Sequence, residues 1–104
     1  MALNPEHYAV TIAHKYRINL KGSGKKISLV YDETIGSGTY GKTFKDNPTV
    51  IHLGKDAFVS EEELANTIAH ELNHCRSFLR GEDAPEETAY AAGNAISEYI
   101  RGER

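Results

Sequence analysis

The chain has 104 residues, of which 39% are hydrophobic and 26% charged, so it can form one small domain spanning 1–104 and is too apolar for a disordered chain. Its single cysteine excludes an internal disulfide, and no apolar run approaches the length of a membrane span. The net charge is −3, with eight Lys or Arg against four acids in residues 1–55 and four against eleven in residues 56–104. The lysines are scattered and the second half is acidic, so neither a nucleic acid nor a membrane is an expected partner.

The first segment of the chain has the features of a helix start. Asn4 is a favoured N-cap residue, and Pro5 suits the first helical position. Tyr8, Ile12 and Tyr16 then recur at helical spacing. The sequence therefore predicts an N-terminal helix whose apolar stripe packs on the rest of the domain.

Three strands are expected next. Residues 26–31 alternate apolar and polar side chains, residues 39–44 show a weaker strand pattern, and residues 49–53 are rich in β-branched side chains. The glycines of 34–41 are not followed by the Gly-Lys-Ser/Thr of a phosphate-binding loop, so we interpret them as a connection between strands. Residues 46–48 are typical of a turn. These strands should form one mainly antiparallel sheet.

A long amphipathic helix is predicted over about residues 60–80. Ser60 is its N-cap, Glu63 is placed three residues on to complete a capping box, and Gly81 follows its end. The apolar side chains of its buried stripe are Leu64, Ile68, Leu72, Cys75 and Leu79. Because Cys75 belongs to this stripe, we interpret it as a core residue rather than a nucleophile.

The central motif of this helix is His70-Glu71-Leu-Asn-His74. Histidines four residues apart project from one side of a helix, where their imidazoles can supply two of the three protein ligands of a catalytic zinc ion. Glu71 lies beside them, where its carboxylate can accept a proton from water. This HExxH arrangement predicts one Zn²⁺ bound by His70 and His74, with Glu71 as general base.

A second helix, expected over about residues 84–101, is the source of the third ligand. Asp83 is its predicted N-cap, and Ala89 marks its buried face. On a helical wheel Glu86 lies about 60° from Ala89, at the margin of the buried face, whereas Glu87 lies on the solvent side. We therefore predict Glu86 as the third ligand, with Glu87 or a water molecule as the alternative.

These residues resemble the gluzincin metallopeptidases, in which HExxH is followed on the next helix by a glutamate in a Glu-x-x-Ala context, matched here by Glu86 and Ala89. The resemblance implies a minimal zincin-like α+β core, zinc held by the two motif histidines and Glu86, and peptide hydrolysis with Glu71 as general base. Two features depart from the family. The spacing from the second histidine to the glutamate is shorter than usual, and Tyr90 stands where many gluzincins have an aspartate that supports a zinc-bound histidine.

The stretch 70–99 is also similar to the small metallopeptidase toxin domains at the C-termini of bacterial polymorphic toxins of the contact-dependent inhibition and Rhs types. This resemblance implies an endopeptidase with a protein or peptide substrate and an immunity protein that covers the cleft. Nothing near Met1 resembles a signal peptide and no apolar run could span a membrane, so we expect a cytoplasmic location. The resemblance to toxin domains implies the alternative, secretion within a larger effector that acts in the cytoplasm of a target cell.

Contacts to the substrate, or a hydrogen bond to the oxyanion of its transition state, could come from three further residues: Tyr90, His52 and Tyr40. In zinc peptidases an edge strand beside the metal helix pairs with the substrate backbone, and the strand 49–53 leads directly into that helix.

The alternative function is a non-catalytic zinc-binding module for protein interaction. Closure of the zinc site by a fourth side chain such as His52 would favour it.

Overall fold

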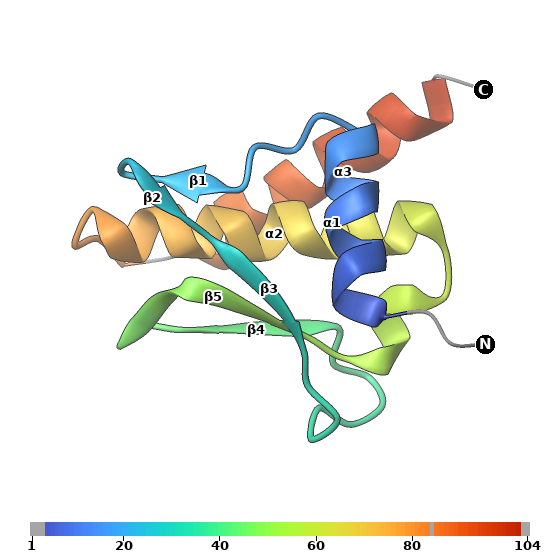
Figure 1. The fold of residues 1–104 in the computed structure, drawn as a ribbon. Coiled ribbons are helices and arrows are strands. Elements are labelled where there is room, and N and C mark those ends of the chain that lie inside the picture. The colour runs from blue at the N-terminus through green and yellow to red at the C-terminus, as the bar shows by residue number, and fades with distance from the viewer. Residues whose placement is uncertain (1–3, 84, 103–104) are drawn as a thin grey trace.

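The computed structural model describes residues 4–83 and 85–102, which fold into α-helices packed on a small sheet (Figure 1). In chain order the elements are α1 (Pro5–Lys15), β1 (Lys21–Gly22), β2 (Lys25–Lys26), β3 (Ser28–Tyr31), β4 (Gly41–Phe44), β5 (Asn47–Leu53), the 3-10 helix η1 (Lys55–Phe58), α2 (Glu61–Leu79) and α3 (Glu86–Gly102). This content of helices and strands confirms the predicted α+β class.

The N-terminal helix α1 begins as its sequence predicts. The side-chain oxygen of Asn4 accepts hydrogen bonds from the backbone N–H groups of Glu6 and His7, at 2.9 and 3.1 Å, and Pro5 occupies the first helical position. The buried face of the helix consists of Ala9, Ile12 and Ala13. Through this face α1 packs on both β3 and α2.

The main sheet has three strands in the order β3-β5-β4. β4 pairs antiparallel with β5, but β3 pairs parallel with β5, with Leu29 opposite Ile51 and Tyr31 opposite Leu53. The sheet is therefore mixed, and the prediction of a mainly antiparallel sheet is wrong for the β3–β5 pair. The apolar, β-branched strand β5 takes the central position, while the shorter and more polar β4 forms an edge, which is the usual placement of such strands.

The turn between β4 and β5 lies at residues 45–46 rather than at the predicted 46–48. Asn47 and Pro48 already belong to β5, where the register of the pairing with β4 shifts. Proline has no backbone N–H to donate, and the first residues of an irregularly paired strand are a position where that loss is tolerated.

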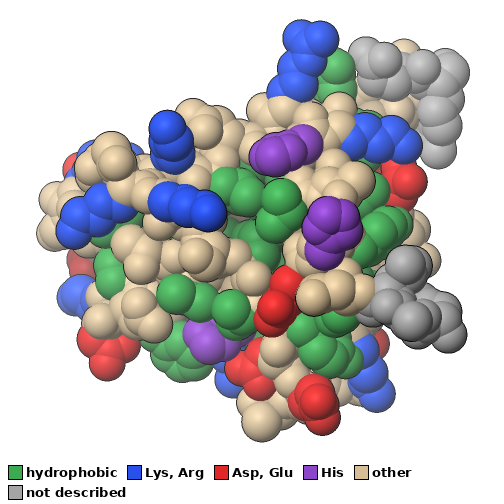
Figure 2. All heavy atoms as spheres, viewed as in Figure 1, with side chains coloured by type: hydrophobic (Ala, Val, Ile, Leu, Met, Phe, Trp, Pro, Cys, Tyr) green, Lys and Arg blue, Asp and Glu red, His purple; other side chains and the backbone are tan. Residues whose placement is uncertain are grey.

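A two-stranded antiparallel ribbon, β1–β2, connects α1 to the sheet. Its turn contains Ser23 and Gly24, which both have positive φ angles of 49° and 77°. Arg76 of α2 holds the ribbon, because its Nε donates to the carbonyl of Lys21 at 2.9 Å and its Nη2 to the carbonyl of Asn19 at 2.8 Å. Lys and Arg side chains gather over this ribbon (Figure 2, blue), so part of the basic first half of the chain is concentrated there.

The central element of the fold is α2, which packs on the sheet on one side and on α3 on the other (Figure 1). Ser60 Oγ accepts from the N–H of Glu63 at 3.0 Å, and Gly81 follows the helix with a φ of 74°, so the N-cap and the glycine after the helix are as predicted. The predicted capping box is incomplete, because the Glu63 side chain makes no hydrogen bond with the described residues. The largest fully buried side chains are Ile27, Ile51, Leu53, Leu64, Ile68 and Cys75. Across the described ranges, no helix has both the length and the apolar character that crossing a membrane requires.

The last helix, α3, begins at Glu86, so the prediction that Asp83 is its N-cap is wrong. The predicted first residue, 84, lies outside the described residues. The first turn is instead defined by the carbonyl of Pro85, which accepts from the Thr88 hydroxyl at 3.1 Å. That hydroxyl also lies 3.2 Å from the Asn73 side-chain oxygen, so a polar contact joins the first turn of α3 to α2.

The contact between α2 and α3 is close because α3 has a glycine where the helices meet. A Cβ atom added at Gly93 would lie 2.5 Å from the side-chain oxygen of Asn66, which is too short for a carbon–oxygen contact. The amide nitrogen of Asn66 donates to Ser97 Oγ at 2.8 Å. This polar contact and the Thr88 contact fix α3 along α2 on both sides of Gly93.

Candidate metal centre

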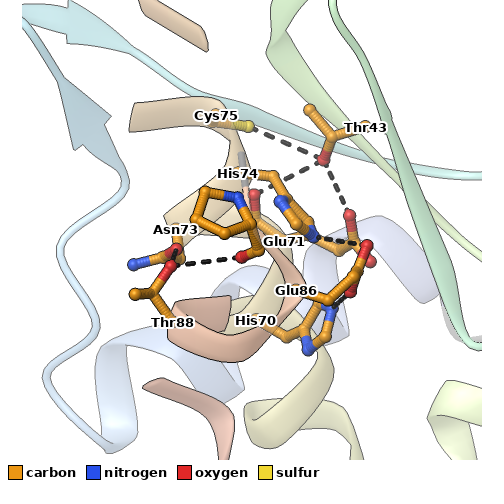
Figure 3. A network of polar contacts seen from close by, with 9 residues as sticks. Thr43, His70, Glu71, Asn73, His74, Cys75, Glu86 and Thr88 are labelled. Atoms are coloured by element: carbon orange, nitrogen blue, oxygen red, sulfur yellow. Dashed lines mark hydrogen bonds and ion pairs between the residues drawn. The ribbon is translucent and has the colours of Figure 1, made fainter. Parts of the chain in front are cut away.

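Two histidines on α2 and the first residue of α3 converge on one point (Figure 3). His70 Nε2 lies 3.1 Å from Glu86 Oε1, and His74 Nε2 lies 3.3 Å from Glu86 Oε2. One nitrogen or oxygen atom from each of the three residues lies within 4.8 Å of the others. Ligands of a tetrahedral zinc ion, at about 2.0–2.1 Å from the metal, are about 3.3 Å from one another. The three side chains are therefore within range to hold a single metal ion.

The centre lies at the surface, with His74 buried, His70 partly buried and the Glu86 carboxylate exposed. The side chains of His70 and His74 are 15% and 9% exposed, whereas that of Glu86 is 65% exposed. A water molecule can therefore approach from the Glu86 side, which a buried structural metal site would not allow. The position of Glu86 in the first turn of α3 also stabilises its negative charge through the helix dipole.

The carboxyl group of Glu71 is buried beside this group, with only 7% of the residue exposed. Its Oε1 accepts a hydrogen bond from the hydroxyl of Thr43 at 2.9 Å, and Thr43 also lies 3.8 Å from the sulfur of Cys75 (Figure 3). Burial raises the pKa of the Glu71 carboxyl, and the Thr43 hydrogen bond partly opposes that rise. The other carboxylate oxygen makes no hydrogen bond with the residues that the structure describes.

The approach of β4 to α2 depends on a second glycine. A Cβ atom at Gly41 would lie 3.0 Å from Thr67 Cγ2, 3.1 Å from Glu71 Cγ and 3.1 Å from the carbonyl oxygen of His52. These distances are shorter than a Cβ atom normally makes, and one of the contacts is to backbone, so a side chain here would require its neighbours to shift. Gly41 therefore allows the edge strand to lie directly against the face of α2 that carries the motif, and this places Thr43 within hydrogen-bonding distance of Glu71.

Aromatic rings surround the two histidines. Tyr90 of α3 packs edge-on against His70, with ring centroids 4.8 Å apart, and Phe78 stacks on His74 at 6.2 Å. Tyr90 therefore limits the orientation of His70 by ring packing. His74 Nδ1 is buried and has no hydrogen-bond partner within the described part of the chain. The polar contact of His74 is thus made at Nε2 alone.

The other candidate residues lie outside the group of His70, His74 and Glu86. His52 is on the central strand β5, where its Nδ1 lies 3.1 Å from Asp32 Oδ2 and its ring packs edge-on against Phe44. It is not part of the metal-binding group, and neither is Glu87. Tyr40 is 42% exposed and lines a cavity next to the centre. The strand beside the centre is β4, so the assignment of the edge position to the strand 49–53 is wrong, because that strand forms the middle of the sheet.

Two cavities extend from the centre along β4. One, of about 540 Å³, lies toward the start of α2 and is lined by Gly38, Thr39, Tyr40, Gly41, Glu63, Asn66, Thr67, His70, Glu71, Glu86 and Tyr90. The other, of about 260 Å³, lies toward the end of α2 and is lined by Gly41, Lys42, Thr43, Phe44, Glu71, His74, Phe78 and Glu86. Because the cavities share Gly41, Glu71 and Glu86, the candidate centre lies between them.

The structure adds Thr43 and Gly41, two residues that the sequence did not single out. Thr43 has no motif of its own, and its contact with Glu71 joins residues far apart in the chain. Gly41 carries a weak signal, since an isolated glycine at a strand often marks a close approach of another segment.

Comparisons of the chain with models of protein families, with curated proteins and with solved structures found no match in any of the three.

Proposed function

We propose that the chain is a zinc-dependent endopeptidase in which His70, His74 and Glu86 hold one zinc ion and Glu71 is the general base. The observation that carries this proposal is the convergence of the two histidines on the Glu86 carboxylate, with Glu71 buried next to them. Two nitrogen ligands and one carboxylate are a donor set used by catalytic zinc. Within the described residues the group has three members, whereas structural zinc sites normally have four.

Each side chain has a separate task in the proposed reaction. When bound, zinc supplies Lewis acidity toward the peptide carbonyl and an attacking water molecule. Glu71 accepts the proton of that water and delivers it to the nitrogen of the leaving amine. Thr43 holds one Glu71 oxygen so that the other faces the water. Tyr90, which contacts His70 and lines the larger cavity, is a candidate donor to the carbonyl oxygen as charge develops there.

The exposed edge of β4 supports an extended peptide as substrate. β4 pairs with β5 along one edge, and in the described sheet its other edge has no partner strand. Such an edge can pair with the backbone of an added peptide strand. A peptide placed along β4 would pass Glu71 and Glu86 and extend into the cavities on both sides.

The test of the proposed function combines metal analysis with cleavage of a proteome-derived peptide library read by mass spectrometry. We expect one zinc per purified chain, new peptide ends after incubation, loss of cleavage with a chelator, and recovery when zinc is added. Zinc binding without any cleavage would contradict the peptidase and favour a non-catalytic zinc-binding module. Cleavage that survives complete zinc removal would contradict the role of the metal.

Replacing Thr43 with valine should lower kcat about tenfold, which corresponds to about 1.4 kcal/mol, because the buried carboxylate loses the hydrogen bond that orients it. Valine keeps the shape of threonine, so zinc content, thermal stability and KM should change little. Thr43→Ser retains the hydroxyl and should keep most of the activity. If the valine and serine variants are equally active, the hydroxyl does not position Glu71.

The resemblance to toxin domains adds a proposal about context, namely that the chain is the toxic domain of a bacterial effector. Expression in the cytoplasm of a bacterial host should then arrest growth, and the arrest should require Glu71. Normal growth during expression of an active peptidase would contradict this context and leave the peptidase proposal in place.

A further inference from the structure

The larger cavity beside the candidate centre contains a carboxylate that neither the metal group nor the proposed reaction uses. Glu63 lies on α2, on the same face as His70, and lines the cavity together with the loop before β4 and with Tyr90. Its backbone N–H donates to Ser60, but its side chain makes no hydrogen bond or ion pair with the residues that the structure describes. The carboxylate is therefore available to a ligand.

The surroundings of Glu63 lack a positive charge. None of the residues that line the cavity is a lysine or an arginine, and two further carboxylates, those of Glu71 and Glu86, line it at the end next to the candidate centre. Partial burial and the charge of the neighbouring Glu62 both raise the pKa of Glu63. Glu62 itself is paired with Arg101, at the other side of the helix start. A cationic group in the cavity would thus supply the partner that Glu63 does not have in the chain.

The distance from Glu63 to the centre fits the reach of a long basic side chain. Glu63 precedes His70 by seven positions on one helix, which is about 10 Å at 1.5 Å per residue. An extended peptide advances about 3.3 Å per residue. A lysine or arginine within about two residues of the cleaved bond can therefore place its charge at Glu63.

The wall of the cavity opposite α2 is held in place. Asp56 of η1 accepts a hydrogen bond from the backbone N–H of Gly38 at 2.8 Å, and the N–H of Gly54 donates to the carbonyl of Tyr40 at 2.9 Å. These contacts fix the loop that forms one side of the cavity. The cavity is thus a formed site for a side chain, bounded by α2, α3 and this loop.

The smaller cavity on the other side of the centre has a different character. Phe44 and Phe78 line it, and its one charged residue outside the shared carboxylates is Lys42. Lys42 would repel a basic side chain, while the two aromatic rings favour an apolar one. The two ends of the groove therefore select different side chains.

From this arrangement we propose that the cavity lined by Glu63 is a specificity subsite for a lysine or arginine side chain of the substrate, held by the Glu63 carboxylate. The smaller cavity takes an apolar side chain on the opposite side of the cleaved bond. This inference rests on the proposed peptidase function and names its substrate class, which is an extended peptide with a basic residue within about two positions of the cleaved bond.

The test compares the cleavage sites of the wild-type protein, Glu63→Gln and Glu63→Lys in one peptide library. Wild-type sites should be enriched in Lys or Arg at one position on one side of the bond. Glu63→Gln should lower the ratio of kcat/KM for a basic over a neutral peptide about tenfold, and Glu63→Lys should shift the preference toward Asp or Glu. Glu62→Gln is the matched control, since Glu62 lies next in sequence but outside the cavity, and it should keep the wild-type preference.

Zinc content and thermal unfolding of each variant show whether a loss of preference arises from damage to the centre or the fold. If wild-type cleavage shows no basic preference, or if Glu63→Gln keeps it, the subsite is wrong while the peptidase function stands. If the zinc-loaded wild-type protein cleaves no peptide, the proposed function is contradicted and this subsite with it.

Discussion

Replacing Glu71 with glutamine should abolish peptide cleavage while leaving zinc content and folding unchanged. Glutamine has the shape of glutamate and keeps an oxygen that can accept from Thr43, so the packing between α2 and β4 is preserved. The neutral amide cannot accept a proton from water, and general-base catalysis typically contributes 10²–10⁴-fold. We therefore expect kcat/KM to fall about a thousandfold, measured on a peptide that the wild-type protein cleaves.

The matched control for this prediction is Glu87→Gln. Glu87 is the next residue after Glu86 on α3, is exposed, and is not part of the metal-binding group. It should retain full activity and full zinc content, and a loss of zinc in this variant would instead support Glu87 as the third ligand. Activity retained in Glu71→Gln would remove Glu71 as the base, because no other residue in the proposed mechanism accepts the proton.

The elements that the sequence predicts well are those governed by local patterns. The start of α2 at Ser60 and its end before Gly81 follow from capping rules that involve neighbouring residues only. The placement of Glu86 at the margin of the buried face of α3 also follows from local geometry, since it depends on the angle between Glu86 and Ala89 within one helix. The angle between two residues on a helical wheel does not depend on where the helix begins. The prediction for Glu86 therefore does not require that Asp83 be the N-cap, and the structure shows that it is not.

The features that the sequence did not predict depend on contacts between distant segments. Strand order is one of them, because β3 pairs with β5 rather than with β4, the next strand in the chain, and that pairing joins segments about twenty residues apart. Thr43 is another, because its hydroxyl acquires a role only when the edge strand lies against α2. The candidate centre thus combines a metal-binding pattern readable from one helix with a support for Glu71 that only the tertiary structure reveals.

Replacing His74 with alanine should remove the metal and lower the stability of the domain. The His74 side chain is 9% exposed and supplies one of the three groups that converge on the centre. A metal ion that binds only the folded state adds stability, about 2.7 kcal/mol when its free concentration is a hundred times its dissociation constant. We expect the zinc content to fall below one tenth of an ion per chain by elemental analysis, with a lower melting temperature than the wild-type protein in zinc.

The response to a chelator separates the loss of metal from the loss of side-chain packing. A chelator should lower the melting temperature of the wild-type protein but leave that of His74→Ala unchanged, because the variant has no bound metal to lose. His52→Ala removes a histidine that pairs with Asp32, away from the centre, so it should keep its zinc and its sensitivity to the chelator. A His74→Ala protein that still carries one zinc per chain would place the metal elsewhere, and the role of Glu71 beside it would lose its basis.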